Sequence, residues 1–250
     1  MGAGETHYKS AFHLLSSAKS MQEEISISRV RRTKEEAKAS YDRLSGWYDL
    51  LTGVAEKKFK EAGLQKLKIK NGEAVLEIGY GTGQCLVPMA QAVGASGKVY
   101  GIDLSEGMKR AAKAKVEKAR MEERVELICG DAAELPYDEN SLDAIFVSFT
   151  LELFDTPEIP IVLGQCRNVL RPAGRICLVT MAKRQESHLM ARLYEWAHEK
   201  LPRYVDCRPI YAQKALTEAG FEVESVTPDS MYGLPMDIIL ARKTSEAKTI

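Results

Sequence analysis

An acidic side chain stands just ahead of three glycines that occupy alternate positions. The stretch VLEIGYGTG at residues 75–83 places Glu77 before Gly79, Gly81 and Gly83. Glycines in this pattern let the backbone take positive φ angles, and they let a ligand lie against bare main chain that any Cβ would obstruct. Apolar residues before the loop and at helical spacing after it predict a strand, a tight turn and a helix. We interpret the stretch as a loop that binds a nucleotide-type cofactor.

The glycine spacing separates the common classes of cofactor loop. A dinucleotide fingerprint, G-x-G-x-x-G, needs a third glycine, but the two registers place Gln84 and Leu86 at that position. A Walker loop fails as well, because no Gly-Lys-Ser/Thr follows the glycines. The pattern that remains is E-x-G-x-G-x-G. Taken alone, it leaves open a turn that is shaped only for packing.

Two carboxylates follow the loop at the ends of further predicted strands. Asp103 ends a strand within residues 97–105, at the place where doubly wound folds hold a ribose with a carboxylate about 20 residues beyond the glycines. A helix cap is the structural alternative for Asp103, but Ser105 is better placed to cap the helix that begins near Glu106. A third strand at residues 125–129 runs into GDAAELPY, which contains Asp131.

Together these motifs resemble the UbiE-like subgroup of class I S-adenosylmethionine-dependent methyltransferases, the quinone C-methyltransferases and their relatives. E-x-G-x-G-x-G is similar to their motif I, and residues 130–143 are similar to their G-D-A-x-x-L-P-[FY]…S-[FL]-D signature. Residues 41–49 resemble their Y-D-x-[ML]-…-Y-D lead-in, and residues 170–175 their L-[RK]-P-x-G-x segment. The resemblance covers residues 40–243 and leaves out the N-terminal tail.

The resemblance implies S-adenosylmethionine as the cofactor. This molecule carries a sulfonium, an ammonium, a carboxylate and a ribose but no phosphate, which suits an acidic residue beside the glycines. No metal is expected. The residues expected to bind the cofactor are Tyr41, Tyr48, Glu77, Gly79, Gly81, Gly83, Asp103, Leu104, Met108, Asp131, Ala132 and Ser148.

Alternating strand and helix patterns predict an α/β fold with a parallel sheet and helices on both faces. The resemblance implies a doubly wound, Rossmann-like sheet of seven strands, mostly parallel with an antiparallel terminal strand. The terminal strands are expected at residues 221–226 and 236–241. The expected domains are a flexible tail at residues 1–32 and the methyltransferase domain at residues 33–243. Within this domain we expect an N-terminal helical lid at residues 33–70 and an acceptor-side insertion at residues 182–210.

Local signals predict two helix starts. Thr33 and Glu36 have the spacing of a capping box, and apolar residues continue at helical steps from Tyr41 to Leu51. The sequence thus predicts one helix through this lead-in, whose aromatic side chains either cover the cofactor or simply pack against the sheet. A second helix is expected after Thr156, with Pro157 in its first turn.

Composition excludes several classes of protein. Lys and Arg number 35, as do Asp and Glu, so the formal net charge of zero gives no reason to expect nucleic acid as a partner. The five cysteines are scattered, which indicates free thiols in a reducing compartment, and we expect a cytoplasmic protein. No apolar run is long enough to cross a bilayer, although peripheral membrane contact stays open. Met1 to Thr6 fit the short N-myristoylation pattern, which often arises by chance.

Methyl transfer to a small-molecule acceptor is the function that the resemblance implies. The acceptor is a quinone precursor, a phospholipid headgroup or another metabolite, and its identity and the oligomeric state are not determined by the sequence. The chemistry needs no dedicated catalytic side chain, because the cofactor brings an activated methyl group. Where the acceptor must lose a proton, His188, His198 and Glu152 are candidate bases. The alternatives are a non-catalytic module that binds S-adenosylmethionine and a nucleotide-dependent oxidoreductase, which the missing third glycine disfavours.

Overall fold

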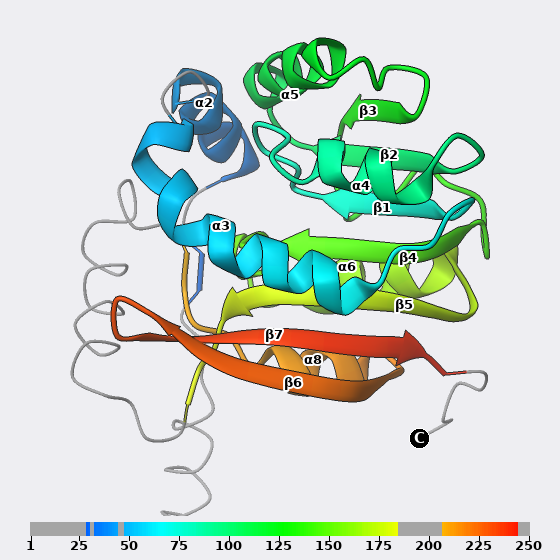
Figure 1. The fold of residues 1–250 in the computed structure, drawn as a ribbon. Helices are drawn as coiled ribbons and strands as arrows, with labels where there is room; N and C mark the ends of the chain where they lie inside the picture. Colours follow the sequence, from blue (N-terminus) through cyan, green and yellow to red (C-terminus); the bar gives the residue numbers. More distant parts are fainter. Residues whose placement is uncertain (1–28, 31–32, 45–47, 185–206, 245–250) are drawn as a thin grey trace, which may run out of the picture.

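The computed structural model describes residues 29–30, 33–44, 48–184 and 207–244, and the strands in these ranges form one seven-stranded sheet. The strand order is β3-β2-β1-β4-β5-β7-β6 (Figure 1). β7 runs antiparallel to both of its neighbours, while the other pairings are parallel. The predicted doubly wound sheet with an antiparallel terminal strand is confirmed. The strands are β1 (Ala74–Ile78), β2 (Lys98–Asp103), β3 (Val125–Cys129), β4 (Leu142–Ser148), β5 (Leu170–Met181), β6 (Phe221–Met231) and β7 (Leu234–Lys243).

Helices cover both faces of the sheet, and each face has its own apolar core. The helices are α2 (Lys34–Leu44), α3 (Tyr48–Leu67), α4 (Leu86–Val93), α5 (Glu106–Lys118), α6 (Ile159–Val169) and α8 (Ala212–Glu218), with a short 3-10 helix η1 (Leu151–Leu153). Side chains from α3, α4 and α5 share one core, and side chains from α6 and α8 share the other. Figure 1 shows α3 and α4 in front of the sheet and α6 and α8 behind it.

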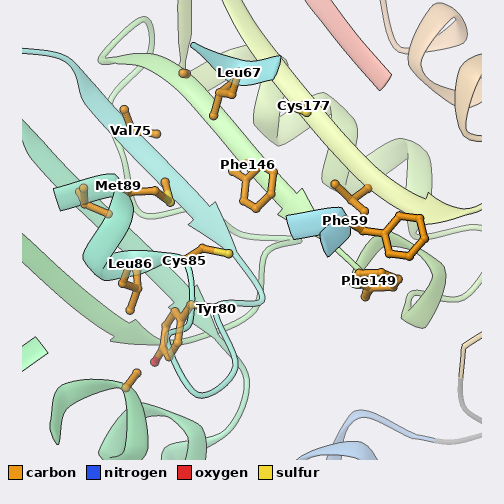
Figure 2. Packing of buried hydrophobic residues seen from close by; sticks show 14 of the residues in the cluster. Phe59, Leu67, Val75, Tyr80, Cys85, Leu86, Met89, Phe146, Phe149 and Cys177 are labelled. Carbon is orange, nitrogen blue, oxygen red and sulfur yellow. The ribbon is translucent and has the colours of Figure 1, made fainter. Parts of the chain in front are cut away.

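Successive side chains along the central strands enter opposite cores, because their direction alternates along a strand. Val75 of β1 faces α3 and α4, whereas Leu76 faces α6. On the first face, Phe146 of β4 lies near Phe59 and Leu67 of α3 (Figure 2). Each such fully buried side chain contributes roughly 1.5 to 3 kcal/mol by leaving water. The central strands therefore contribute apolar side chains to both cores.

The connections between strands set the place of the site. The chain leaves β1 toward β2 and leaves β4 toward β5, on opposite sides, so the strand order reverses between β1 and β4. Ligands in open α/β sheets bind at such a switch point, outside the carboxyl ends of the strands. The glycine loop follows β1 at this point. α2 lies on the side toward which the arrowheads of β4 and β5 point (Figure 1).

The N-terminal helical region differs in part from the prediction. The capping box is confirmed, because the Thr33 amide donates to Glu36 Oε2 at 3.1 Å and the Glu36 amide donates to Thr33 Oγ1 at 3.2 Å. The single helix through the lead-in was wrong. α2 ends at Leu44 and α3 begins at Tyr48, so two helices replace one. Two helices allow α2 to stand over the site while α3 packs on the sheet.

Two other boundaries were also misplaced. Thr156 is not the helix cap, because residues 155–158 form a turn closed by a 2.9 Å bond from the Glu158 amide to the Asp155 carbonyl. α6 consequently begins at Ile159. The terminal strands are longer than expected because Tyr232 and Gly233 both have positive φ, the geometry of a tight hairpin turn.

Arg175 joins the end of α3 to β5. Its guanidinium donates to the Leu67 carbonyl at 2.6 Å, the Lys68 carbonyl at 2.9 Å and the Glu73 carboxylate at 2.6 and 2.9 Å. The Arg175 side chain is 9% exposed and that of Glu73 is 14% exposed. This buried pair fixes α3 against the sheet.

We predict that Arg175→Met lowers the free energy of unfolding by about 3 to 5 kcal/mol, because it leaves Glu73 buried without its partner. Arg171→Met is the matched control, since Arg171 pairs with Asp143 at the surface and such pairs contribute about 1 kcal/mol or less. Urea denaturation followed by circular dichroism measures both changes. Equal losses in the two variants would contradict the role given to Arg175.

Candidate cofactor site

The three glycines of the loop all have positive φ angles, but they differ in what surrounds them. Their φ values are 70°, 52° and 80°. A Cβ on Gly79 would lie 2.2 Å from Thr150 Oγ1, and one on Gly83 would lie 2.9 Å from the Ala112 Cβ. A Cβ on Gly81 would meet no described atom within 4 Å. Gly79 and Gly83 thus serve packing, while the space over Gly81 is open to a ligand.

A cavity of about 160 Å³ opens at the carboxyl ends of the strands, between the glycine loop and α2. Its walls bring together most of the residues that the sequence predicted for the cofactor. Those residues are Tyr41, Gly79, Gly81, Asp103, Leu104, Met108, Asp131 and Ala132. Apolar side chains from Ile78, Ile102, Leu153 and Phe154 line it as well.

The remaining predicted residues lie elsewhere. Glu77 and Ser148 line a second cavity of about 30 Å³, which shares Gly79 and Gly81 with the main cavity. Gly83 lines neither of these two cavities, since its place is between α4 and α5. The side chain of Tyr48 lies outside the described residues. Its role toward the cofactor stays a prediction.

Asp103 is held rigidly at the end of β2. Its Oδ2 accepts from the Gly81 amide at 2.8 Å, and its Oδ1 accepts from the Ser105 amide at 3.0 Å. Burial raises the pKa of Asp103, although these backbone hydrogen bonds oppose the shift. Ser105 caps α5 by accepting from the Met108 amide, so the helix-cap alternative for Asp103 does not hold. Each carboxylate oxygen can still accept a second hydrogen bond, as binding to two ribose hydroxyls requires.

Glu77 is a buried carboxyl at the end of β1. Its side chain is 2% exposed, and its Oε2 has no hydrogen-bond partner in the described part of the chain. Burial raises the pKa of Glu77 to about 8, against the opposing effects of nearby Lys60 and a hydrogen bond with Cys85. An unpaired buried oxygen is costly, and a cation placed against it would relieve that cost. The open space over Gly81, the paired oxygens of Asp103 and this free oxygen fit a cofactor that carries a ribose and an ammonium.

α2 is fastened over the main cavity by charged groups. Lys34 Nζ lies 2.5 Å from Asp131 Oδ2 and 2.5 Å from Glu158 Oε1. At the other end of α2, Asp42 Oδ1 accepts from Ser105 Oγ at 2.6 Å and from the Gly107 amide at 2.7 Å. Asp42 therefore caps the first turn of α5 from outside that helix.

Arg29, which lies just before α2, makes a third charged contact beside the main cavity, with Asp155 of its lining. Its guanidinium donates to both carboxylate oxygens of Asp155, at 2.6 to 2.9 Å. Sequence reasoning missed Arg29, Lys34 and Asp42. Only Asp42 carried a signal, as part of the Tyr-Asp pair that opens the lead-in motif.

Of the candidate bases, only Glu152 is described. It is completely buried, and it accepts from Thr180 Oγ1 at 2.9 Å and the Met181 amide at 3.3 Å. Burial raises the pKa of Glu152 to about 7, but the side chain lines neither cavity. His188 and His198 lie outside the described residues. The position of Glu152 favours a structural role over that of a base.

Within the described ranges, no helix is long and apolar enough to cross a membrane. The same ranges contain no group of three or more His, Cys, Asp or Glu side chains arranged to hold a metal ion.

We predict that Glu77→Gln stabilises the ligand-free protein. The unfolded carboxyl ionises near pH 4.5 and the folded one near pH 8, so unfolding releases a proton between these values and stability falls as pH rises. At pH 7 the raised pKa of Glu77 lowers the free energy of unfolding by about 3 kcal/mol. We expect the substitution to raise the free energy of unfolding by about 1 to 3 kcal/mol. Urea denaturation at about pH 5 and pH 7.5 should show the gain only at the higher pH. Lower stability of the variant at both pH values would show that Glu77 stabilises the fold, and would contradict this prediction.

Comparison with known proteins agrees with this geometry. Residues 75–174 match the family model of a methyltransferase domain. A demethylmenaquinone methyltransferase from Bacillus mycoides is 34% identical over 157 residues, which are 60% of this chain and 65% of the relative. The chain thus matches less than two thirds of the length of that relative.

Solved structures share the fold. A SAM-dependent methyltransferase from Aquifex aeolicus superposes with a TM-score of 0.55 at 25% identity, over 73% of this chain and 88% of that chain. The [4+2]-cyclase SpnF superposes with a TM-score of 0.69 over 86% of this chain and 98% of that chain, but at 17% identity it shows the fold alone. With its glycine loop and its strand-end carboxylates, the segment 75–174 is a methyltransferase domain, and the chain is similar in sequence to demethylmenaquinone methyltransferases and in fold to SAM-dependent methyltransferases.

Proposed function

We propose that the protein transfers a methyl group from S-adenosylmethionine to a small-molecule acceptor. The observation that carries the proposal is the open space over Gly81, with Asp103 bound to the Gly81 amide and with Glu77 Oε2 left without a partner among the described residues. Relatives named demethylmenaquinone methyltransferase favour a quinone precursor among the acceptors. A phospholipid headgroup and other metabolites remain alternatives that a turnover assay can separate.

The residues of this chain bind and align the reactants. S-adenosylmethionine, when bound, supplies a methyl group that its positive sulfur already activates. Asp103 would accept the ribose hydroxyls, and Glu77 would receive the ammonium, giving up its proton at neutral pH. The Ile78 and Ile102 side chains give the cavity an apolar wall, which favours a dry site where a weakly solvated nucleophile reacts faster.

We infer that α2 and the first part of α3 act as a lid. Lys34 and Asp42 tie α2 to the site by ionic and capping contacts, which can open at less cost than a packed apolar face. Closure would exclude water from the cavity. The acceptor-side insertion at residues 182–210 is described only at 182–184 and 207–210 and remains a prediction, as do the tail, a cytoplasmic location and contact with a membrane surface.

The proposed function is tested by binding and turnover with the full chain. Isothermal titration should detect binding of S-adenosylmethionine and of its demethylated product, S-adenosylhomocysteine. It should detect no binding of NAD. Incubation with methyl-labelled cofactor and a short-chain demethylmenaquinone should transfer label to the quinone. Cofactor binding without turnover on quinone, phospholipid or metabolite extracts would support a non-catalytic binding module. NAD binding in preference to S-adenosylmethionine would overturn the proposal.

We predict that Gly81→Val abolishes measurable S-adenosylhomocysteine binding while the protein still folds. The added side chain enters open space in the folded protein, so the cost is mainly the strain of a positive φ, about 1 to 2 kcal/mol. Gly79→Ala is the comparison variant, because its Cβ collides with Thr150 and should lower the melting temperature further. Titration and thermal unfolding separate the two effects. Normal affinity in folded Gly81→Val would show that the loop is only a turn.

We also predict that Asp42→Ala loosens the lid. Loss of the cap on α5 should speed amide hydrogen exchange in residues 34–44 and weaken cofactor binding together, since Ser105 contacts both Asp42 and Asp103. Arg43→Ala, on the exposed side of the same helix, is the control. In the wild type, S-adenosylhomocysteine should slow exchange in this segment. Equally slow exchange with and without the ligand would show that α2 is a fixed part of the fold.

A further inference from the structure

One buried arginine is left without an ionic partner among the described residues. The Arg208 side chain is fully buried, and its Nη2 donates to the Phe154 carbonyl at 2.6 Å. Its Nε and Nη1 have no hydrogen-bond partner in the described part of the chain. Burial lowers the pKa of Arg208 to about 10, so the guanidinium is still charged at neutral pH. A buried cation with most of its donors unused is costly unless a ligand brings the missing anion.

The carboxylates that attract Arg208 are already bonded to other groups. Asp155 and Glu152 both oppose the fall in its pKa, so their charges lie near it. Asp155, however, accepts from the Arg29 guanidinium with both carboxylate oxygens. Glu152 accepts from Thr180 Oγ1 with one oxygen and from a backbone amide with the other. Neither carboxylate is hydrogen-bonded to Arg208, and the described chain therefore does not neutralise this cation directly.

The backbone near Arg208 places it beside the carboxyl end of β5. The Ile210 amide donates to the Met181 carbonyl at 3.1 Å, and the Ile210 carbonyl accepts from the Lys183 amide at 3.0 Å. Residues 208–210 consequently run next to the end of β5. Asp103 ends β2, which lies on the other side of β1 from β4 and β5. If the cofactor occupies the β1–β2 side of the switch point, the β4–β5 side is left for the acceptor.

Phe154 connects Arg208 to the main cavity. This residue lines the cavity together with Leu153 and Asp155, and its carbonyl is the one that Arg208 binds. Arg208 is not itself part of the cavity lining, so an acceptor contacts it only when this part of the wall shifts. The wall is weakly held here, because η1 is only three residues long and the Phe154 amide lies 3.4 Å from the Leu151 carbonyl.

We propose that Arg208 binds an anionic oxygen of the methyl acceptor, and so selects acceptors that carry an ionised hydroxyl or a carboxylate. This inference rests on the proposed function and deepens it by naming the class of acceptor. The planar guanidinium suits such groups, because neighbouring N–H donors can bind one or two oxygens together. The acidic side chains of the cavity repel the anion little, since Arg29 and Lys34 are paired with them. A protonated amine would be repelled by Arg208.

The first test needs no acceptor and uses thermal unfolding of the ligand-free full chain. Arg208→Met removes an unpaired buried cation, so it should raise the melting temperature by about 2 to 4 °C. Arg175→Met is the opposite control, because it breaks a buried ion pair and should lower the melting temperature. An unchanged or lower melting temperature in Arg208→Met would show that the chain itself neutralises this arginine, and would overturn the proposal.

The second test compares three acceptors, each with methyl-labelled cofactor. They are a short-chain demethylmenaquinol, whose hydroxyls can ionise, a hydroxynaphthoate, which carries a carboxylate, and vesicles of phosphatidylethanolamine, whose amine is a cation. The wild type should methylate at least one of the first two and leave the amine unmodified. Arg208→Met should lower kcat/KM about tenfold or more, while S-adenosylhomocysteine binding stays within about twofold. Arg208→Lys should recover part of the activity.

The pH dependence identifies the source of the anion and excludes a merely structural role. A cation beside an ionising hydroxyl lowers the pKa of that hydroxyl. With the quinol, the rise of kcat/KM with pH should therefore move about one pH unit higher in Arg208→Met. With the carboxylate, which is ionised throughout, KM should rise and the profile should keep its position.

Methylation of the amine alone, or of none of the three acceptors, would overturn the inference about Arg208. Isothermal titration of the wild type with S-adenosylhomocysteine, run in parallel, decides separately whether the cofactor assignment holds. Equal kcat/KM in Arg208→Met and the wild type would also exclude this role while leaving the proposed methyl transfer intact.

Discussion

The burial of one ionisable carboxyl at the centre of the sheet constrains much of this structure. Glu77 lies one residue before the end of β1, between β2 and β4, and it is buried with one of its oxygens unpaired among the described residues. A fold selected for stability alone would place an apolar residue there, as it does at Leu76 and Ile78. The strand order reverses at the same point, so this costly side chain stands where a ligand can reach it. Glu77 therefore lowers the stability of the fold at the position where a ligand can contact it.

Several charged side chains near the glycine loop come from helices outside the matched domain of residues 75–174. α3 brings Lys60 and Glu56 to one side of the glycine loop, and α2 brings Asp42 to the other. Ser105 links α2 to the cofactor side, because its hydroxyl donates to Asp42 while its amide donates to Asp103. A movement of α2 would therefore be transmitted to Asp103 through these two hydrogen bonds. The matched domain supplies the glycine loop and Asp103, and the N-terminal helices place charged side chains beside them.

Local chemistry made part of the structure predictable. The positive φ of the loop glycines, the cap at Ser105 and the carboxylate at Asp103 each follow from a short-range rule, and each is present. The sequence alone could not separate Gly81 from Gly79, because the difference lies in Thr150, a residue far along the chain. The doubly wound sheet of seven strands was expected from family resemblance, since local patterns do not specify which strands pair.

The charged residues of α3 show why the rest could not be predicted. Nothing in the local sequence distinguishes the buried Lys60 from the exposed Lys57 or Lys58. Burial there depends on how α3 docks on the sheet. A Cβ on Gly63 would lie 2.6 Å from Val179 Cγ2, so this glycine permits a close approach, and Arg175 fixes the end of the helix. Both contacts join segments more than a hundred positions apart, beyond any local rule.

The place of β7 in the sheet has a consequence for how the molecule is made. Residues 234–243 follow β6 in the chain but lie between β5 and β6 in space. While the chain is being made, β6 is synthesised before its partner β7. β6 then has no strand to pair with, and the edge of β5 that will pair with β7 is also open. Until then that edge is open to strands of other chains. Closure of the sheet is one late event in which the whole hairpin docks, so newly made copies are most exposed to aggregation shortly before synthesis of this strand is complete.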